Sequence, residues 1–151
     1  MPFLVEKRFN PAARLPQRPA AGGADSELSI AVIFTSIEPT LSALRRAATL
    51  ADRLRARITL MVPQVVPYPL PLTQPPVPLD FTERRFRVIA NQAPVETIVR
   101  IYLCRNRTEA LTAALRPHSL VVIGDRGGWW PTAEKRLGRQ LRRAGHEVLF
   151  A

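Results

Sequence analysis

Glycines cluster behind a short apolar run near the carboxyl end of the chain, and this stretch offers the clearest chemistry in the sequence. The run Leu120–Gly124 (LVVIG) ends at a glycine, Gly127 and Gly128 follow, and a helical pattern starts near Thr132. Glycine lets the backbone approach a phosphate closely and leaves its N–H groups free to donate. The order strand, glycine loop, helix is typical of the crevice at the carboxyl edge of a parallel sheet. The stretch therefore predicts a site for an anion.

Residues with catalytic or metal-binding chemistry are few and scattered. His118 and His146 lie far apart in sequence, without a carboxylate or cysteine at ligand spacing, so they predict no metal site. Cys104 has no histidine near it in sequence, and we interpret it as a packed residue at a strand end. We find no pair of carboxylates and no serine, histidine and aspartate set that suggests catalysis. We expect no catalytic residues and no enzyme activity.

Aromatic and basic residues follow the glycines. Trp129 and Trp130 are adjacent, so one helix stripe cannot bury both, and we expect one to pack into the core and the other to stack on a base or a partner. Arg136, Arg139 and Arg143 recur at helical spacing and form a basic face. Two interpretations stay open. A solvated face is favoured over a nucleic-acid surface, because no aromatic residue interleaves with the arginines.

The net charge of +10 comes from 20 Arg and 2 Lys against 12 acidic residues. The planar guanidinium group of arginine binds phosphates and carboxylates, so one interpretation of this charge is an anionic partner. The other interpretation is a compositional bias of the sequence toward arginine, alanine and proline. The amino terminus lacks the apolar core of a secretory signal, and no stretch reaches the roughly 20 apolar residues of a membrane span. A single cysteine fits a reducing compartment. We expect a cytoplasmic protein without membrane contact.

Strands and helices alternate along the chain and must position these residues. Apolar, β-branched runs predict strands at 28–36, 58–62, 95–104, 119–124 and 147–151. Apolar residues at helical spacing predict helices at 40–54, 81–90, 106–115 and 132–144, the first capped by Thr40. This alternation implies right-handed crossovers and an open, mostly parallel five-stranded α/β sheet with helices on both faces.

The 151 residues suit one domain, with two segments outside the regular pattern. Residues 1–26 hold four prolines and no apolar period, which predicts a flexible tail, so the domain spans 27–151. Residues 63–80 hold seven prolines, which predicts extended chain and excludes a central strand. A crossover loop on the surface is favoured over a lid or a docking segment.

Three stretches carry a resemblance to a known family: SIAVIFTSIEPTLSALRRAATLADRLRARITLMV, RTEALTAALRPHSLVVIGDRGG and LGRQLRRAGHEVLFA. From Ser29 to Ala151 the chain resembles the universal stress protein family in element order, in the register of the first helix and in the VVIG ending of the fourth strand. The resemblance implies the strand order 3-2-1-4-5. It also implies a homodimer that pairs through the last strand, which lies at the sheet edge.

Members of that family that bind ATP carry an aspartate after the first strand and the pattern Gly-x2-Gly-x9-Gly-Ser/Thr after the fourth. Here Thr35 stands at the place of the aspartate. Ten residues separate Gly127 from Gly138 where the family has nine, and Arg139 replaces the hydroxyl residue. Bound ATP or AMP would therefore meet an altered set of residues: Thr35, Pro63, Gly124, Gly127, Gly128, Gly138 and Arg139.

Three functions follow as hypotheses. The first is a non-enzymatic, universal stress-like regulatory protein that forms a homodimer, contacts an unknown protein partner and has a degraded ATP-binding motif. The second is an ATP or AMP switch of the same family. The third is a nucleic-acid-associated protein that uses its basic residues.

Overall fold

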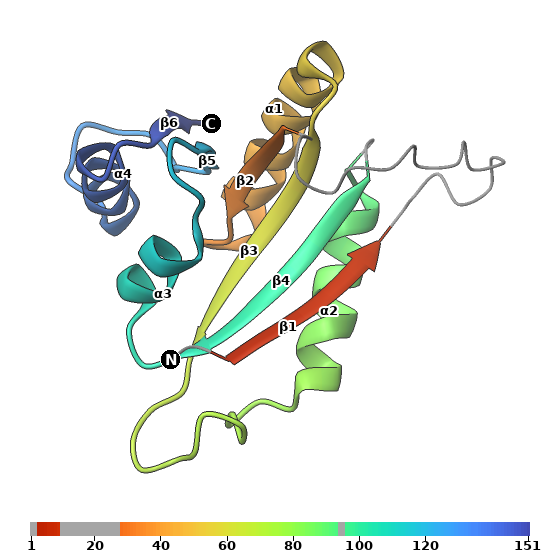
Figure 1. The fold of residues 1–151 in the computed structure, drawn as a ribbon, viewed down its shortest axis with the longest axis vertical. Coiled ribbons are helices and arrows are strands. Elements are labelled where there is room, and N and C mark those ends of the chain that lie inside the picture. Colours follow the sequence, from red (N-terminus) through yellow and green to blue (C-terminus); the bar gives the residue numbers. More distant parts are fainter. Residues whose placement is uncertain (1–2, 10–27, 94–95) are drawn as a thin grey trace, which may run out of the picture.

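A six-stranded sheet forms the centre of the fold in the computed structural model, which describes residues 3–9, 28–93 and 96–151 (Figure 1). Its order is β1-β4-β3-β2-β5-β6. Strands β2 to β6 run parallel and have the predicted order 3-2-1-4-5 when they alone are numbered, which confirms the predicted sheet. The strands are β1 (Phe3–Phe9), β2 (Ser29–Ile33), β3 (Arg57–Val65), β4 (Thr97–Cys104), β5 (Leu120–Ile123) and β6 (Glu147–Phe150).

Helices cover both faces of the sheet, as predicted (Figure 1). Helices α1 (Ile37–Leu54) and α2 (Leu79–Asn91) pack with Leu60 and Val62 of β3 in one core. Met61 points to the other face and packs there with α3 (Arg107–Ala114) and α4 (Ala133–Arg143). Successive residues of a strand point to opposite faces, so one apolar run supplies both cores. None of the described helices is both long and apolar enough to cross a membrane.

The first helix starts three residues earlier than predicted. Helix α1 begins at Ile37 after Ser36, and Ser36 makes no side-chain cap. Thr40 lies inside the helix, fully buried, and its Oγ1 accepts a hydrogen bond from the backbone N–H of Thr35 at 3.2 Å. The prediction of Thr40 as the cap was therefore wrong. Its hydroxyl instead joins the helix to the chain that leaves β2.

The prediction of a flexible tail is wrong for Phe3–Phe9. These residues form β1, which pairs antiparallel with β4 from Phe3 opposite Leu103 to Phe9 opposite Thr97. The hydrogen bonds that order this segment come from a strand about ninety residues later, so no local pattern announces them. The rest of the predicted tail, residues 1–2 and 10–26, lies outside the described residues.

The proline-rich segment is shorter than predicted. Pro63 lies within β3 opposite Tyr102, and Leu79 already belongs to α2. The carbonyl oxygen of Met61 accepts a hydrogen bond from the N–H of Phe34, which follows the end of β2. Pro63 lies two residues further along β3, so its backbone nitrogen faces the same side as Met61, at a point beyond the end of β2. Its missing N–H therefore costs no ladder hydrogen bond.

The loop between β3 and α2 is folded into turns rather than extended. Leu70 N–H donates to Pro67 O and Gln74 N–H to Pro71 O, each at 3.0 Å. Arg105 holds the loop, because its Nη1 donates to Val66 O at 2.9 Å and its guanidinium lies 4.0 Å from the centre of the Tyr68 ring. The predicted polyproline-like geometry was wrong.

Candidate functional site

The carboxyl ends of the parallel strands meet at one edge of the sheet, and we call this edge, with the loop 124–132, the crevice. Thr35 follows β2 and Gly124 follows β5, and the two lie together, since Thr35 Oγ1 donates to Gly124 O at 3.4 Å. The backbone N–H of Asp125 donates to Ala151 O at 2.9 Å, which joins the loop to the end of β6. The structure thus unites Thr35 and Gly124 as expected, but the Thr35 hydroxyl is engaged by the protein itself.

Gly124 is required by packing. A Cβ on this residue would lie 1.9 Å from the carbonyl oxygen of Pro39 and 2.2 Å from its carbonyl carbon. The first turn of α1 therefore rests directly on the backbone at the end of β5, and protein occupies the space that a glycine leaves for a ligand. Gly124 is buried.

Gly127 and Gly128 face solvent in the loop. Their φ values of +75° and +107° belong to a region that side chains disfavour, and a Cβ on either would meet nothing within 4 Å. These two glycines therefore make a turn that carries the loop away from the sheet.

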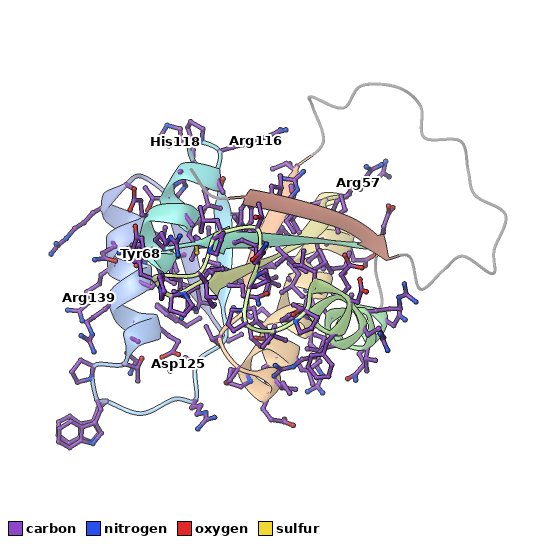
Figure 2. All side chains as sticks on the ribbon, turned by 90° about the horizontal axis from the view of Figure 1, so that it is seen from below. Arg57, Tyr68, Arg116, His118, Asp125 and Arg139 are labelled. Carbon is purple, nitrogen blue, oxygen red and sulfur yellow. The ribbon has the colours of Figure 1, made fainter. Side chains whose placement is uncertain are left out.

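Gly138 and Arg139 do not join the loop glycines, which corrects the predicted grouping. Gly138 is the sixth residue of α4, about 8 Å along the helix from its start. A Cβ there would lie 2.4 Å from Cζ of Phe150, so this glycine lets β6 approach α4. Arg139 lies on the exposed side of the helix, where Figure 2 shows it pointing away from the fold. The resemblance matched them by spacing alone, and spacing does not show that α4 has already begun.

Lys135 takes a place in the crevice that sequence reasoning did not assign to it. Its ammonium group lies 3.7 Å from a carboxylate oxygen of Asp125 and donates to the carbonyl oxygens of Gly128 and of Trp130. Its backbone N–H donates to Oγ1 of Thr132, the N-cap of α4, at 3.2 Å. The charge and one N–H group at the start of α4 are thus satisfied within the protein.

Arg107 was also missed. Its Nη2 donates to Phe34 O at 3.0 Å, while its Nε is buried without a hydrogen-bond partner among the described residues. Burial lowers the pKa of Arg107, and the negative charge of Glu134 acts in the opposite direction. Arg107 is the first residue of α3 and follows a strand end, which was the one signal in the sequence that it lies at this edge.

Cys104 is the last residue of β4 and is buried, as predicted. Burial raises the pKa of its thiol, and the neighbouring charge of Arg107 lowers it by a smaller amount. A neutral thiol in this setting is a weak nucleophile.

Pro63 lines a groove of about 250 Å³ between the strand ends and α2. The ring of Phe34 forms its floor with Phe86, at 4.7 Å between centres, and the guanidinium of Arg85 lies 5.7 Å from the Phe34 ring. Gln64 also lines the groove, and its Oε1 is buried without a hydrogen-bond partner among the described residues. Pro63 is thus grouped with apolar side chains rather than with the loop glycines.

Both tryptophans lie on the surface. Trp129 is 81% and Trp130 is 66% exposed, and their rings stack at 4.4 Å with an angle of 26° between their planes. The prediction that one of them packs into the core was wrong. The ammonium of Lys135 binds the carbonyl oxygens of Gly128 and Trp130, and the indoles stack on each other on the surface.

The histidines lie at the opposite end of β5 from the crevice, as the positions of His118 and Asp125 in Figure 2 show. Nδ1 of His146 accepts a hydrogen bond from the N–H of Ser119 at 3.1 Å, and Nδ1 of His118 lies 3.3 Å from Gly145 O. Within the described ranges, no three histidine, cysteine, aspartate or glutamate side chains group as metal ligands would.

The sheet order and the two helical layers define the universal stress protein fold. A crystal structure of a protein from the universal stress protein family of Burkholderia pseudomallei is similar to this chain, with a TM-score of 0.57 and 21% sequence identity over 82% of this chain and 94% of that one. At this identity the likeness concerns the fold. No family model and no curated protein matches the sequence.

Proposed function

We propose that this chain is a universal stress-like regulatory protein of the cytoplasm that acts without catalysis, through a homodimer and contact with a protein partner, and has lost the family's nucleotide site. The observation that carries the proposal is the filled crevice. The backbone of Pro39 occupies the space above Gly124, and the Lys135 ammonium is bound by Asp125 and two loop carbonyls.

The chemistry left at the crevice is poor for a triphosphate. Of the glycines expected to line the phosphates, one supports α1, one supports β6, and two form an exposed turn. An incoming phosphate would have to compete with Asp125 for Lys135, and it would gain no serine or threonine hydroxyl at position 139. The positive charge of Lys135 is thus already paired with Asp125 before a nucleotide arrives.

Calorimetric titration with ATP and Mg²⁺ tests this part of the proposal. We expect no binding heat at millimolar nucleotide and no nucleotide released when the purified protein is denatured. Lys135→Ala removes the cation from the crevice, and this variant is titrated in the same way as the control. Saturable heat with the unaltered protein, lost in Lys135→Ala, would instead establish a nucleotide site at the crevice.

An ATP or AMP switch is kept as the second candidate because of the groove beside Pro63. The groove has aromatic walls that can stack on a planar base, and Gln64 lines it as well. Saturable heat in the same titration that survives Lys135→Ala but is lost in Gln64→Ala would support this candidate.

The homodimer is proposed to form through β6, which lies at the sheet edge. The N–H groups of Glu147 and Ala151 donate to β5, so the backbone groups of Val148 and Phe150 turn to the open edge. Arg142 covers part of that edge, since its Nη2 donates to Val148 O at 2.7 Å and its guanidinium lies 5.4 Å from the Phe150 ring centre. A second β6 strand would have to displace this contact.

Replacing Arg142 by glutamine is therefore expected to strengthen the dimer several-fold, because Val148 O then becomes available to the partner strand. Sedimentation equilibrium over a concentration series measures the dissociation constant. Arg143→Gln removes the same charge from the exposed next residue and is expected to leave the constant unchanged. A chain that stays monomeric in all three forms would contradict pairing through β6.

A further inference from the structure

An exposed aromatic pair precedes a helix that carries a row of arginines, and neither function proposed in the preceding subsection uses this surface. We call this surface the Trp–Arg ridge; it consists of Trp129, Trp130, Arg136, Arg139 and Arg143. All five side chains are exposed. The two tryptophans are the only ones in the chain.

The arginines of the ridge share one side of α4. The residues that bury this helix are Leu137, Gly138 and Leu141, and at 100° per residue the arginine row lies on the opposite side. From Arg136 to Arg143 the row is about 10 Å long. The helical period places Thr132, the N-cap of α4, on the same side of the helix as the arginine row. The loop that carries the indoles leads directly into Thr132.

The loop holds the indoles at the end of this row. Lys135, which is next to the arginine stripe, donates to the carbonyl oxygens of Gly128 and Trp130, and Asp125 pairs with the same ammonium. The two indoles stack on each other, so each indole keeps its outer ring face open to a partner. The fold thus places aromatic rings at the amino end of the helix that carries the arginines, although the sequence does not interleave them.

We propose that the Trp–Arg ridge binds single-stranded nucleic acid, with unpaired bases stacked on the indoles and the phosphates along Arg136, Arg139 and Arg143. Stacking on aromatic rings beside a basic track is the usual means of binding single strands. The net charge of +10 favours a polyanion. An acidic protein would engage the arginines alone, and a duplex keeps its base faces stacked, so neither accounts for the indoles.

Intrinsic fluorescence tests the proposal at this surface alone, because no tryptophan lies elsewhere. Titration with a short oligothymidylate at low salt is expected to quench the emission in a saturable way. The affinity should exceed that for the same sequence as a duplex and for polyglutamate of equal charge. Absence of binding at low salt overturns the proposal, and so does equal or tighter binding of the duplex or of polyglutamate.

Variants separate stacking from charge, with binding followed by anisotropy of a labelled oligonucleotide. Trp129→Ala with Trp130→Ala is expected to weaken binding about ten- to a hundredfold, and both residues are exposed, so the fold is not at risk. Glutamine at Arg136, Arg139 and Arg143 should reduce the slope of log affinity against log salt by about 2, at about 0.7 for each phosphate contact.

The matched control removes three exposed arginines from α1, on the other face of the sheet: Arg45→Gln, Arg46→Gln and Arg53→Gln. It lowers the net charge by the same amount and should leave the salt slope nearly unchanged. An equal loss in this control would show that net charge alone attracts the strand and would overturn the assignment to the ridge. Full affinity without the tryptophans would do the same.

Discussion

Replacing Gly124 by alanine is expected to lower the free energy of unfolding by about 3 kcal/mol. The added Cβ would lie 1.9 Å from Pro39 O, a backbone atom in the first turn of α1, which cannot rotate away as a side chain can. Strand β5 is paired on both sides, with β2 and β6, so it cannot shift to relieve the contact. Equilibrium denaturation in urea, monitored by circular dichroism, measures the loss.

Two other glycines serve as controls for this substitution. Gly127→Ala places a Cβ in open solvent and strains only a φ of +75°, so we expect a cost of about 1 kcal/mol. Gly138→Ala meets the ring of Phe150, which can turn, and gains roughly 1 kcal/mol of helix propensity, so it should fall between them. A Gly124→Ala protein as stable as Gly127→Ala would contradict the packing role and reopen the interpretation of Gly124 as a ligand-binding glycine.

Replacing Leu44 by alanine is expected to cost about 3–4 kcal/mol. Leu44 is 1% exposed and belongs to the core that α1 forms with β2 and β3. Removing its side chain leaves a cavity, because the surrounding helix and strands relax only in part. Thermal and chemical denaturation of the variant measure the change.

Leu54→Ala is the matched control in the same helix. The helical period places Leu44 and Leu54 on one stripe, but Leu54 is 45% exposed in the last turn of α1. We therefore expect a cost of about 1 kcal/mol or less. Equal losses at the two positions would mean that α1 packs along its whole length, against the structure described above.

Local patterns in the sequence were enough to predict the five parallel strands, the four helices and the sheet edge where a site would lie. The run LVVIG is apolar throughout because β5 is buried on both faces, and Thr132 and Asn106 cap α4 and α3 through their own side chains. These signals are local, since each depends on residues within one element or one turn. The strand order came from the resemblance, and the pairing of the strands confirms it.

Only the tertiary structure decided which of the candidate residues are available. Whether Gly124 is a ligand site or a contact depends on Pro39, 85 positions earlier, and Gly138 depends in the same way on Phe150. The pairing of β1 with β4 is equally remote in sequence. Lys135 is the clearest case, because helical spacing groups it with solvated arginines, whereas the turn of the loop places it against Asp125. Spacing describes one element, while the occupancy of a crevice depends on what other elements place there.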